Sequence, residues 1–200
     1  VDKLEDLYTK LSPPKINLTL FPRQQPTELE YFLTELLHKH DEPHLIGGHF
    51  ENRNSIRTEL ECALKKHDIP QNEIWLKDME FITSSFINES INSVNYSLCI
   101  GGSMFPHGTK WHRDINQVQN RLLINYGGDT TEFVSNDACI ESDFIEWPEV
   151  RVDAPVHKIP KYWLGLMACG EYCITHRIPN LEKRVVFILV GFPIRLYTIM

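Results

Sequence analysis

Apolar residues in the first half of the chain recur at the three- and four-residue spacing of amphipathic helices. One helical face is formed by Leu29, Phe32, Leu33, Leu36 and Leu37. The segment 27–30 reads Thr-Glu-Leu-Glu, the form of a capping box, so we expect this helix to begin there. The same spacing predicts a second helix over 54–67 and a third over 73–86.

From residue 93 onward the pattern changes to short runs rich in β-branched and aromatic residues, with glycine and proline between them. These runs predict strands at 93–100, 109–114, 121–126, 130–135, 151–159, 162–168, 172–177, 185–191 and 194–199. Many short strands without intervening helices are typical of an antiparallel barrel or jelly roll. We therefore expect an α+β fold in which a helical N-terminal region, 1–92, packs outside a β-barrel domain, 93–200.

The composition is that of a soluble globular protein, with 42% hydrophobic and 24% charged residues. The longest apolar run, 185–192, is far shorter than the roughly 20 residues that span a bilayer, so no membrane partner is expected. Five cysteines are an odd number and fit a reducing compartment, so we expect a cytoplasmic protein. A net charge of −7 makes nucleic acid an unlikely partner.

The segment 111–114, Trp-His-Arg-Asp, places a histidine and an aspartate two positions apart. On a strand His112 and Asp114 would leave the same face, while Arg113 points away. A third ligand of the right kind is His176, in another predicted strand. Two histidines and one carboxylate on one side of a metal leave open positions for substrate and dioxygen, which is typical of non-haem Fe(II) oxygenases. The sequence thus predicts a metal site that is also catalytic.

An oxygenase that uses a 2-oxo acid needs a cation for the far carboxylate, and Arg184 follows His176 by eight positions. A guanidinium matches a carboxylate with two parallel hydrogen bonds and stays charged when buried. On the strand that follows, Arg184 shares a face with Val186, Ile188 and Val190. A buried arginine among apolar neighbours favours an anionic ligand.

The order of these motifs resembles the iron(II)- and 2-oxoglutarate-dependent oxygenases of the prolyl hydroxylase type. The resemblance rests on the motif at 112–114, Arg121, the turn Gly-Gly-Asp-Thr-Thr-Glu-Phe at 127–133, His176 and Arg184. The segments Thr-Glu-Phe at 131–133 and His-Arg-Ile-Pro at 176–179 are also similar to uncharacterised bacterial families with T-E-W and H-R-x-P segments. The resemblance implies a double-stranded β-helix barrel, Fe(II) held by His112, Asp114 and His176, and 2-oxoglutarate held by Arg184. It implies hydroxylation or demethylation of a small-molecule or protein substrate.

Several alternatives stay open at the level of sequence. Lys183, Arg121 or Tyr96 could replace Arg184 as the cofactor-binding residue. A cupin-like metalloenzyme that does not use 2-oxoglutarate would carry the same metal ligands, and a non-catalytic barrel could serve as a binding module. The sequence does not determine the substrate or the oligomeric state.

Overall fold

Two antiparallel sheets organise the molecule, which we describe from a computed structural model over residues 2–40, 42–90, 94–102, 106–115, 120–140, 145–178 and 183–191. The major sheet has six strands in the order β1-β7-β4-β9-β3-β2, and the minor sheet has three in the order β6-β5-β8. The strands are β1 (Leu18–Phe21), β2 (His44–Phe50), β3 (Val94–Gly101), β4 (Asn120–Gly128), β5 (Glu132–Val134), β6 (His157–Lys158), β7 (Leu164–Met167), β8 (Thr175–Arg177) and β9 (Arg184–Gly191).

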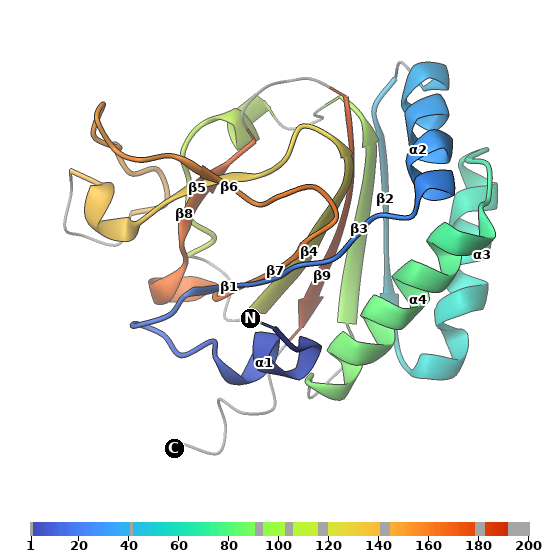
Figure 1. Ribbon diagram of the computed structural model, residues 1–200, viewed down its shortest axis with the longest axis horizontal. Coiled ribbons are helices and arrows are strands. Elements are labelled where there is room, and N and C mark those ends of the chain that lie inside the picture. The colour runs from blue at the N-terminus through green and yellow to red at the C-terminus, as the bar shows by residue number, and fades with distance from the viewer. Residues whose placement is uncertain are drawn as a thin grey trace.

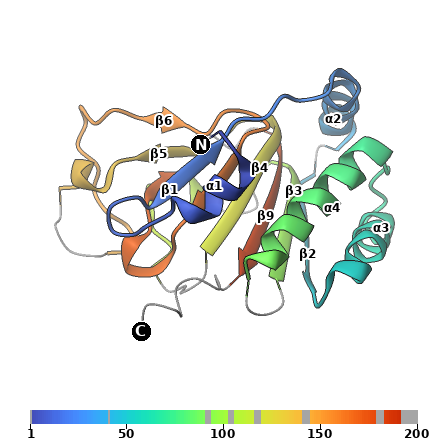
Figure 2. The ribbon, with the colours of Figure 1, turned by 60° about the horizontal axis from the view of Figure 1, so that its bottom comes forward.

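Helices cover one face of the major sheet, and the minor sheet lies toward the other face (Figures 1 and 2). The α-helices are α1 (Leu4–Thr9), α2 (Thr27–Lys39), α3 (Ile56–Lys66) and α4 (Glu73–Asn88). Short 3₁₀ turns occur at η1 (Arg53–Ser55), η2 (Pro106–Thr109), η3 (Asn136–Ala138) and η4 (Gly170–Tyr172). No helix in these described ranges is long and apolar enough to cross a membrane.

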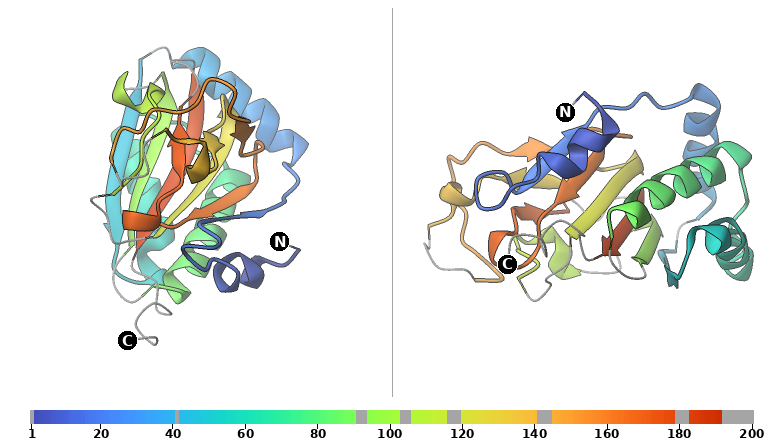
Figure 3. Two further views of the ribbon diagram at one scale, coloured as in Figure 1. Left: turned by 90° about the vertical axis from the view of Figure 1, so that its left-hand side faces the viewer. Right: turned by 90° about the horizontal axis from the view of Figure 1, so that it is seen from below.

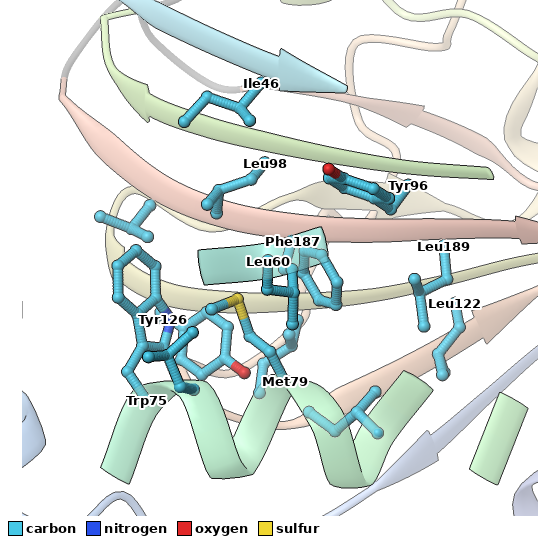
Figure 4. Close-up of a cluster of buried hydrophobic side chains, with 14 of the residues drawn as sticks. Ile46, Leu60, Trp75, Met79, Tyr96, Leu98, Leu122, Tyr126, Phe187 and Leu189 are labelled. Atoms are coloured by element: carbon cyan, nitrogen blue, oxygen red, sulfur yellow. The ribbon is translucent and has the colours of Figure 1, made fainter. Parts of the chain in front are cut away.

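The larger hydrophobic core lies between the helices and the major sheet. Trp75 and Met79 of α4 point toward Leu98, Tyr126 and Phe187 of the sheet (Figure 4). Strand alternation explains the division of β9, because its residues 185, 187 and 189 enter this core while 184, 186, 188 and 190 face the other side. That second set is the face predicted to carry Arg184.

A smaller core lies on the opposite face of the major sheet, toward the minor sheet. It is made of Leu123, Ile159, Met167 and Ile174. Leu123 and Met167 of this cluster also line a cavity on the same face of the sheet.

A buried polar network fastens the segment before α2 to α4. The guanidinium of Arg23 pairs with Asp78 and lies over the ring of Tyr162, 4.5 Å from its centroid. The hydroxyl of Tyr126 donates to the same carboxylate at 2.7 Å. Asp78 therefore compensates a buried cation and a buried hydroxyl together.

The three predicted helices are confirmed, with one correction at a terminus. Helix α2 begins at Thr27 itself, with Pro26 at the capping position and no side-chain cap. The predicted capping box does not form, because Thr27 already lies inside the helix. At α4 the cap is real, since Asn72 Oδ1 accepts a hydrogen bond from the Trp75 amide at 3.0 Å.

The region predicted to be helical, 1–92, also contains β1 and β2, which form both edges of the major sheet. The predicted strand at 109–114 is wrong, since only His112 makes a β-bridge there. The predicted strand at 151–159 shrinks to the two residues of β6, and the one at 194–199 lies outside the described residues. The paired glycines 47 and 48 concealed β2, because glycine gives no hydrophobic signal.

Candidate metal centre

Three side chains predicted to bind metal lie together between the two sheets. His112 and Asp114 precede β4, and His176 lies in β8. Their ligand atoms all lie within 4.8 Å of one another. Within the described part of the chain, no other group of three or more histidine, cysteine or carboxylate residues has this geometry.

The two histidines lie opposite each other in an antiparallel β-bridge. The amide of each residue donates to the carbonyl oxygen of the other at 3.0 Å, and the ring centroids lie 4.4 Å apart. Nδ1 of His112 lies 2.9 Å from the Lys110 carbonyl oxygen, and Nδ1 of His176 lies 2.9 Å from that of Ile174. A carbonyl oxygen only accepts, so each Nδ1 carries a proton, and in the neutral form of each ring Nε2 keeps the lone pair.

Asp114 completes the group, with Oδ2 3.5 Å from Nε2 of His176. The backbone amide of Asp114 donates to the Cys173 sulfur at 3.2 Å, which orients the residue. Nη1 of Arg121 lies 2.6 Å from Oδ2 as an ion pair, yet Oδ2 makes no hydrogen bond of normal geometry among the described residues. A buried carboxylate oxygen with remaining acceptor capacity fits a metal ligand.

The ionisation of His112 suits metal binding. Burial, and to a lesser degree the neighbouring His176, lower the pKa of His112 to about 4. The ring is therefore neutral at physiological pH, the form that coordinates a metal.

A cavity of about 430 Å³ lies beside these three side chains. His112, Asp114 and His176 line one side, and the apolar face of β9 formed by Val186, Ile188 and Val190 lines the other. Arg184, at the start of β9, lines the same cavity. The three residues predicted to bind metal and the arginine predicted to bind the cosubstrate therefore line one cavity.

Arg184 is 7% exposed, and its Nη1 is buried without a hydrogen-bond partner in the described residues. Burial lowers the pKa of Arg184, while the nearby Cys99 and Asp129 oppose the shift. On each neighbouring strand the residue paired with Arg184 is a glycine, Gly101 of β3 and Gly128 of β4. A side chain at Gly128, where φ is +73°, would overlap the Lys183 carbonyl oxygen.

Of the other residues considered for cofactor binding, only Arg121 lines this cavity. Tyr96 is on the helix-facing side of β3, where its ring stacks on Phe50 at 4.5 Å, so it does not line the cavity. Lys183 donates to the Leu37 carbonyl oxygen at 3.1 Å. Arg121 does line the cavity, but it lies beside Asp114.

Arg113 does point away from the ligands, but it is not solvated. It is 3% exposed, and its Nε donates to Thr175 Oγ1 at 2.8 Å. Sequence reasoning did not assign Trp147 to the site, although its ring centroid lies 5.6 Å from that of His112 and it lines the cavity. Trp147 reaches the site because the Arg113 amide donates to the Glu146 carbonyl oxygen at 2.8 Å, a contact that no local pattern signals.

Comparison with known proteins gives one family match. The family described as "Protein of unknown function (DUF1826)" matches residues 2–189. No curated protein sequence matches the chain.

Two solved structures have limited similarity to this one. The dioxygenase for auxin oxidation 1 of Arabidopsis thaliana, in complex with 2-oxoglutarate, is 9% identical with a TM-score of 0.46 over 88% of this chain and 83% of its own. A Pseudomonas putida prolyl-4-hydroxylase is 10% identical with a TM-score of 0.44 over 96% of this chain and 99% of its own.

Proposed function

We propose that this chain, which belongs to the DUF1826 family, is an iron(II)- and 2-oxoglutarate-dependent oxygenase. One observation carries the proposal: a His-Asp-His ligand group and a buried arginine without a hydrogen-bond partner at Nη1 line a single cavity. The first part fits a metal, and the second fits a carboxylate that arrives with the cosubstrate.

The donor set favours iron for a chemical reason. Two neutral imidazoles and one carboxylate on one side of the ion form the facial arrangement of non-haem Fe(II) oxygenases, with positions left for exogenous ligands. His112 and His176 would bind through Nε2, because Nδ1 of each ring is hydrogen-bonded to a carbonyl oxygen. Arg121 would hold the Asp114 carboxylate in place from the side.

Arg184 is the reason to expect a cosubstrate with two carboxylates. Its buried charge is costly unless an anion compensates it, and the cavity offers room for one. The carboxylate of 2-oxoglutarate remote from the keto group would pair with the guanidinium, which leaves the keto acid end to face His112, Asp114 and His176. The apolar face of β9 would exclude water from the rest of the cosubstrate.

Iron bound here would supply dioxygen activation coupled to oxidative decarboxylation of 2-oxoglutarate, and so hydroxylation or demethylation of a C–H bond in the substrate. The chain would position the metal ligands and exclude water from the cavity. It orients both imidazoles, keeps His112 neutral and binds the cosubstrate at one end. In this proposal the two facing sheets form a double-stranded β-helix, with His112 extending the minor sheet beside β8.

The test measures succinate. Protein loaded anaerobically with Fe(II) and then supplied with 2-oxoglutarate and air should release succinate without a prime substrate, and His176→Ala should not. Release that is equal in the wild type and the variant would show that the site is not responsible. Tight iron binding without any binding of 2-oxoglutarate would contradict the cosubstrate and favour a cupin-like metalloenzyme.

A further inference from the structure

Strand β2 lies at one edge of the major sheet. Its seven residues pair with β3 in unbroken register from His44↔Ile100 to Phe50↔Val94. In the described part of the chain no strand pairs with its other side, and in Figure 3 (left) β2 forms the outer margin of the sheet. The strand contains no proline, lysine or bulge, which are the usual devices that block strand addition.

The residues of β2 leave this edge accessible. Leu45, Gly47, Gly48 and His49 are exposed, whereas the central strands β4 and β9 are mostly buried. Gly48 has a steric reason to lack a side chain, because a Cβ there would lie 2.7 Å from the Tyr96 ring. Gly47 has no such reason, since the nearest atom to its Cβ would be a backbone oxygen at 3.5 Å.

Hollows adjoin the strand on both faces. On the helix side a groove of about 420 Å³ separates Gly48 and Tyr96 from α3. On the other side Leu45 lines the cavity that His112, Asp114 and His176 also line. An added strand would therefore place alternate side chains in the groove and, on the opposite face, on the side of the cavity that Leu45 lines.

We propose that β2 binds an extended polypeptide segment as a seventh strand of the major sheet, with a basic side chain in the groove beside α3. Main-chain hydrogen bonds to β2 would provide the affinity, as in other strand-addition complexes. The groove would provide the selectivity for a basic side chain. Two carboxylates, Glu51 and Glu59, line the groove against one amine, Lys66. His49 also lines the groove and lies 3.7 Å from Glu51.

A second copy of this chain fits the edge less well than a peptide. A two-fold pairing of β2 with itself would use an edge roughly 24 Å long. It would leave the groove empty, and one strand pair provides little of the roughly 1,200–2,000 Å² that stable interfaces bury. An extended peptide matches the length of β2 and fills the groove.

The bound segment is the substrate of the oxygenase if the proposed function holds, because its cavity-side residues lie next to Leu45. Docking itself does not depend on that function. The experiment therefore uses metal-free full-length protein, so that a failure of docking and a failure of catalysis are seen separately.

The probe is a fluorescent peptide of about ten residues that alternates lysine and valine, compared with one that alternates glutamate and valine. We expect micromolar binding of the basic probe only. Glu59→Lys should weaken it about fivefold and Lys66→Glu should strengthen it by a similar factor. Glu35→Lys, which changes the net charge equally but lies on α2 outside the groove, should bind as the wild type does.

Hydrogen exchange provides the structural readout. The probe should slow amide exchange in 44–50 and leave β1 unchanged. Three results would overturn the proposal. The first is that the basic probe does not bind even at millimolar concentration, and the second is that Glu59→Lys and Lys66→Glu bind it equally. The third is concentration-dependent dimerisation of the protein that protects 44–50 when no probe is present.

Discussion

His112 and His176 fix each other through their backbones, since each amide donates to the carbonyl oxygen of the other at 3.0 Å. This bridge sets the two rings side by side without requiring a long strand at 109–114. Because the bridge uses only backbone atoms, it does not depend on either imidazole side chain. The expected consequence is that single ligand substitutions remove metal binding without unfolding the protein.

His112→Ala should abolish stoichiometric Fe(II) binding, because the two remaining ligands hold the ion poorly. Anaerobic titration calorimetry measures the effect, and the wild type should bind about one ion per chain. His38→Ala is the matched control, since His38 is exposed at the end of α2. Wild-type affinity in His112→Ala would place the iron elsewhere.

Arg184→Leu should weaken 2-oxoglutarate binding by about ten- to a hundredfold, because a hydrogen bond to a charged group contributes roughly 1.5–3 kcal/mol. Binding is measured with Fe(II) present and dioxygen absent. Arg53→Leu is the control, because Arg53 is exposed in η1. Arg113 is unsuitable, because its burial and its bond to Thr175 make its loss structural.

If Arg184→Leu binds 2-oxoglutarate normally while Arg121→Leu does not, the cation that binds the cosubstrate is Arg121. Arg121→Leu is also expected to weaken metal binding, because it removes the ion pair with Asp114. Metal and cosubstrate titrations on both variants separate these two roles.

Asp78→Ala should lower the free energy of unfolding by about 3–5 kcal/mol, because it leaves the Arg23 charge buried without its partner. Tyr126→Phe should cost less, since it removes one hydroxyl and leaves the ion pair intact. Urea denaturation at neutral pH compares the two. Equal losses would mean that the ion pair contributes little beyond the tyrosine hydrogen bond.

Stability should fall between pH 10 and pH 12. Burial raises the pKa of Tyr8 to about 12, although its hydrogen bond with Ser85 opposes the shift. The folded state thus keeps a proton that the unfolded state loses near pH 10, so the stabilisation is complete below pH 10 and disappears as pH rises toward 12. Burial raises the pKa of Tyr162 to about 12 as well.

Urea denaturation at pH 9 and pH 11 tests this expectation. Tyr8→Phe should show a smaller loss of stability between the two pH values than the wild type, because phenylalanine does not ionise. Tyr31→Phe is the control, since Tyr31 is 71% exposed. Identical losses in wild type and Tyr8→Phe would mean that Tyr8 titrates as it does in the unfolded chain.

Local sequence was most informative where the pattern was regular. Helices α2, α3 and α4 followed from apolar spacing, and β3, β4 and β9 from β-branched runs. It failed at β1 and β2, because short or glycine-containing edge strands carry little hydrophobic periodicity and are decided by the strand they pair with. The sequence pattern also predicted a full strand at 109–114. In the structure a single β-bridge between His112 and His176 holds this segment beside β8.

The sequence by itself determined the residue types of the candidate ligands, the order in which they occur and the face of β9 that carries Arg184, because residue type and strand alternation are local properties. Only the tertiary structure decided that Arg121 pairs with Asp114, that Tyr96 faces the helices, that Arg113 is buried and that Trp147 borders the cavity. Each of these depends on which segments, distant along the chain, pack against one another. The physical reason is that the environment of a side chain comes from its neighbours in space, and a single sequence specifies those neighbours only through the folded chain.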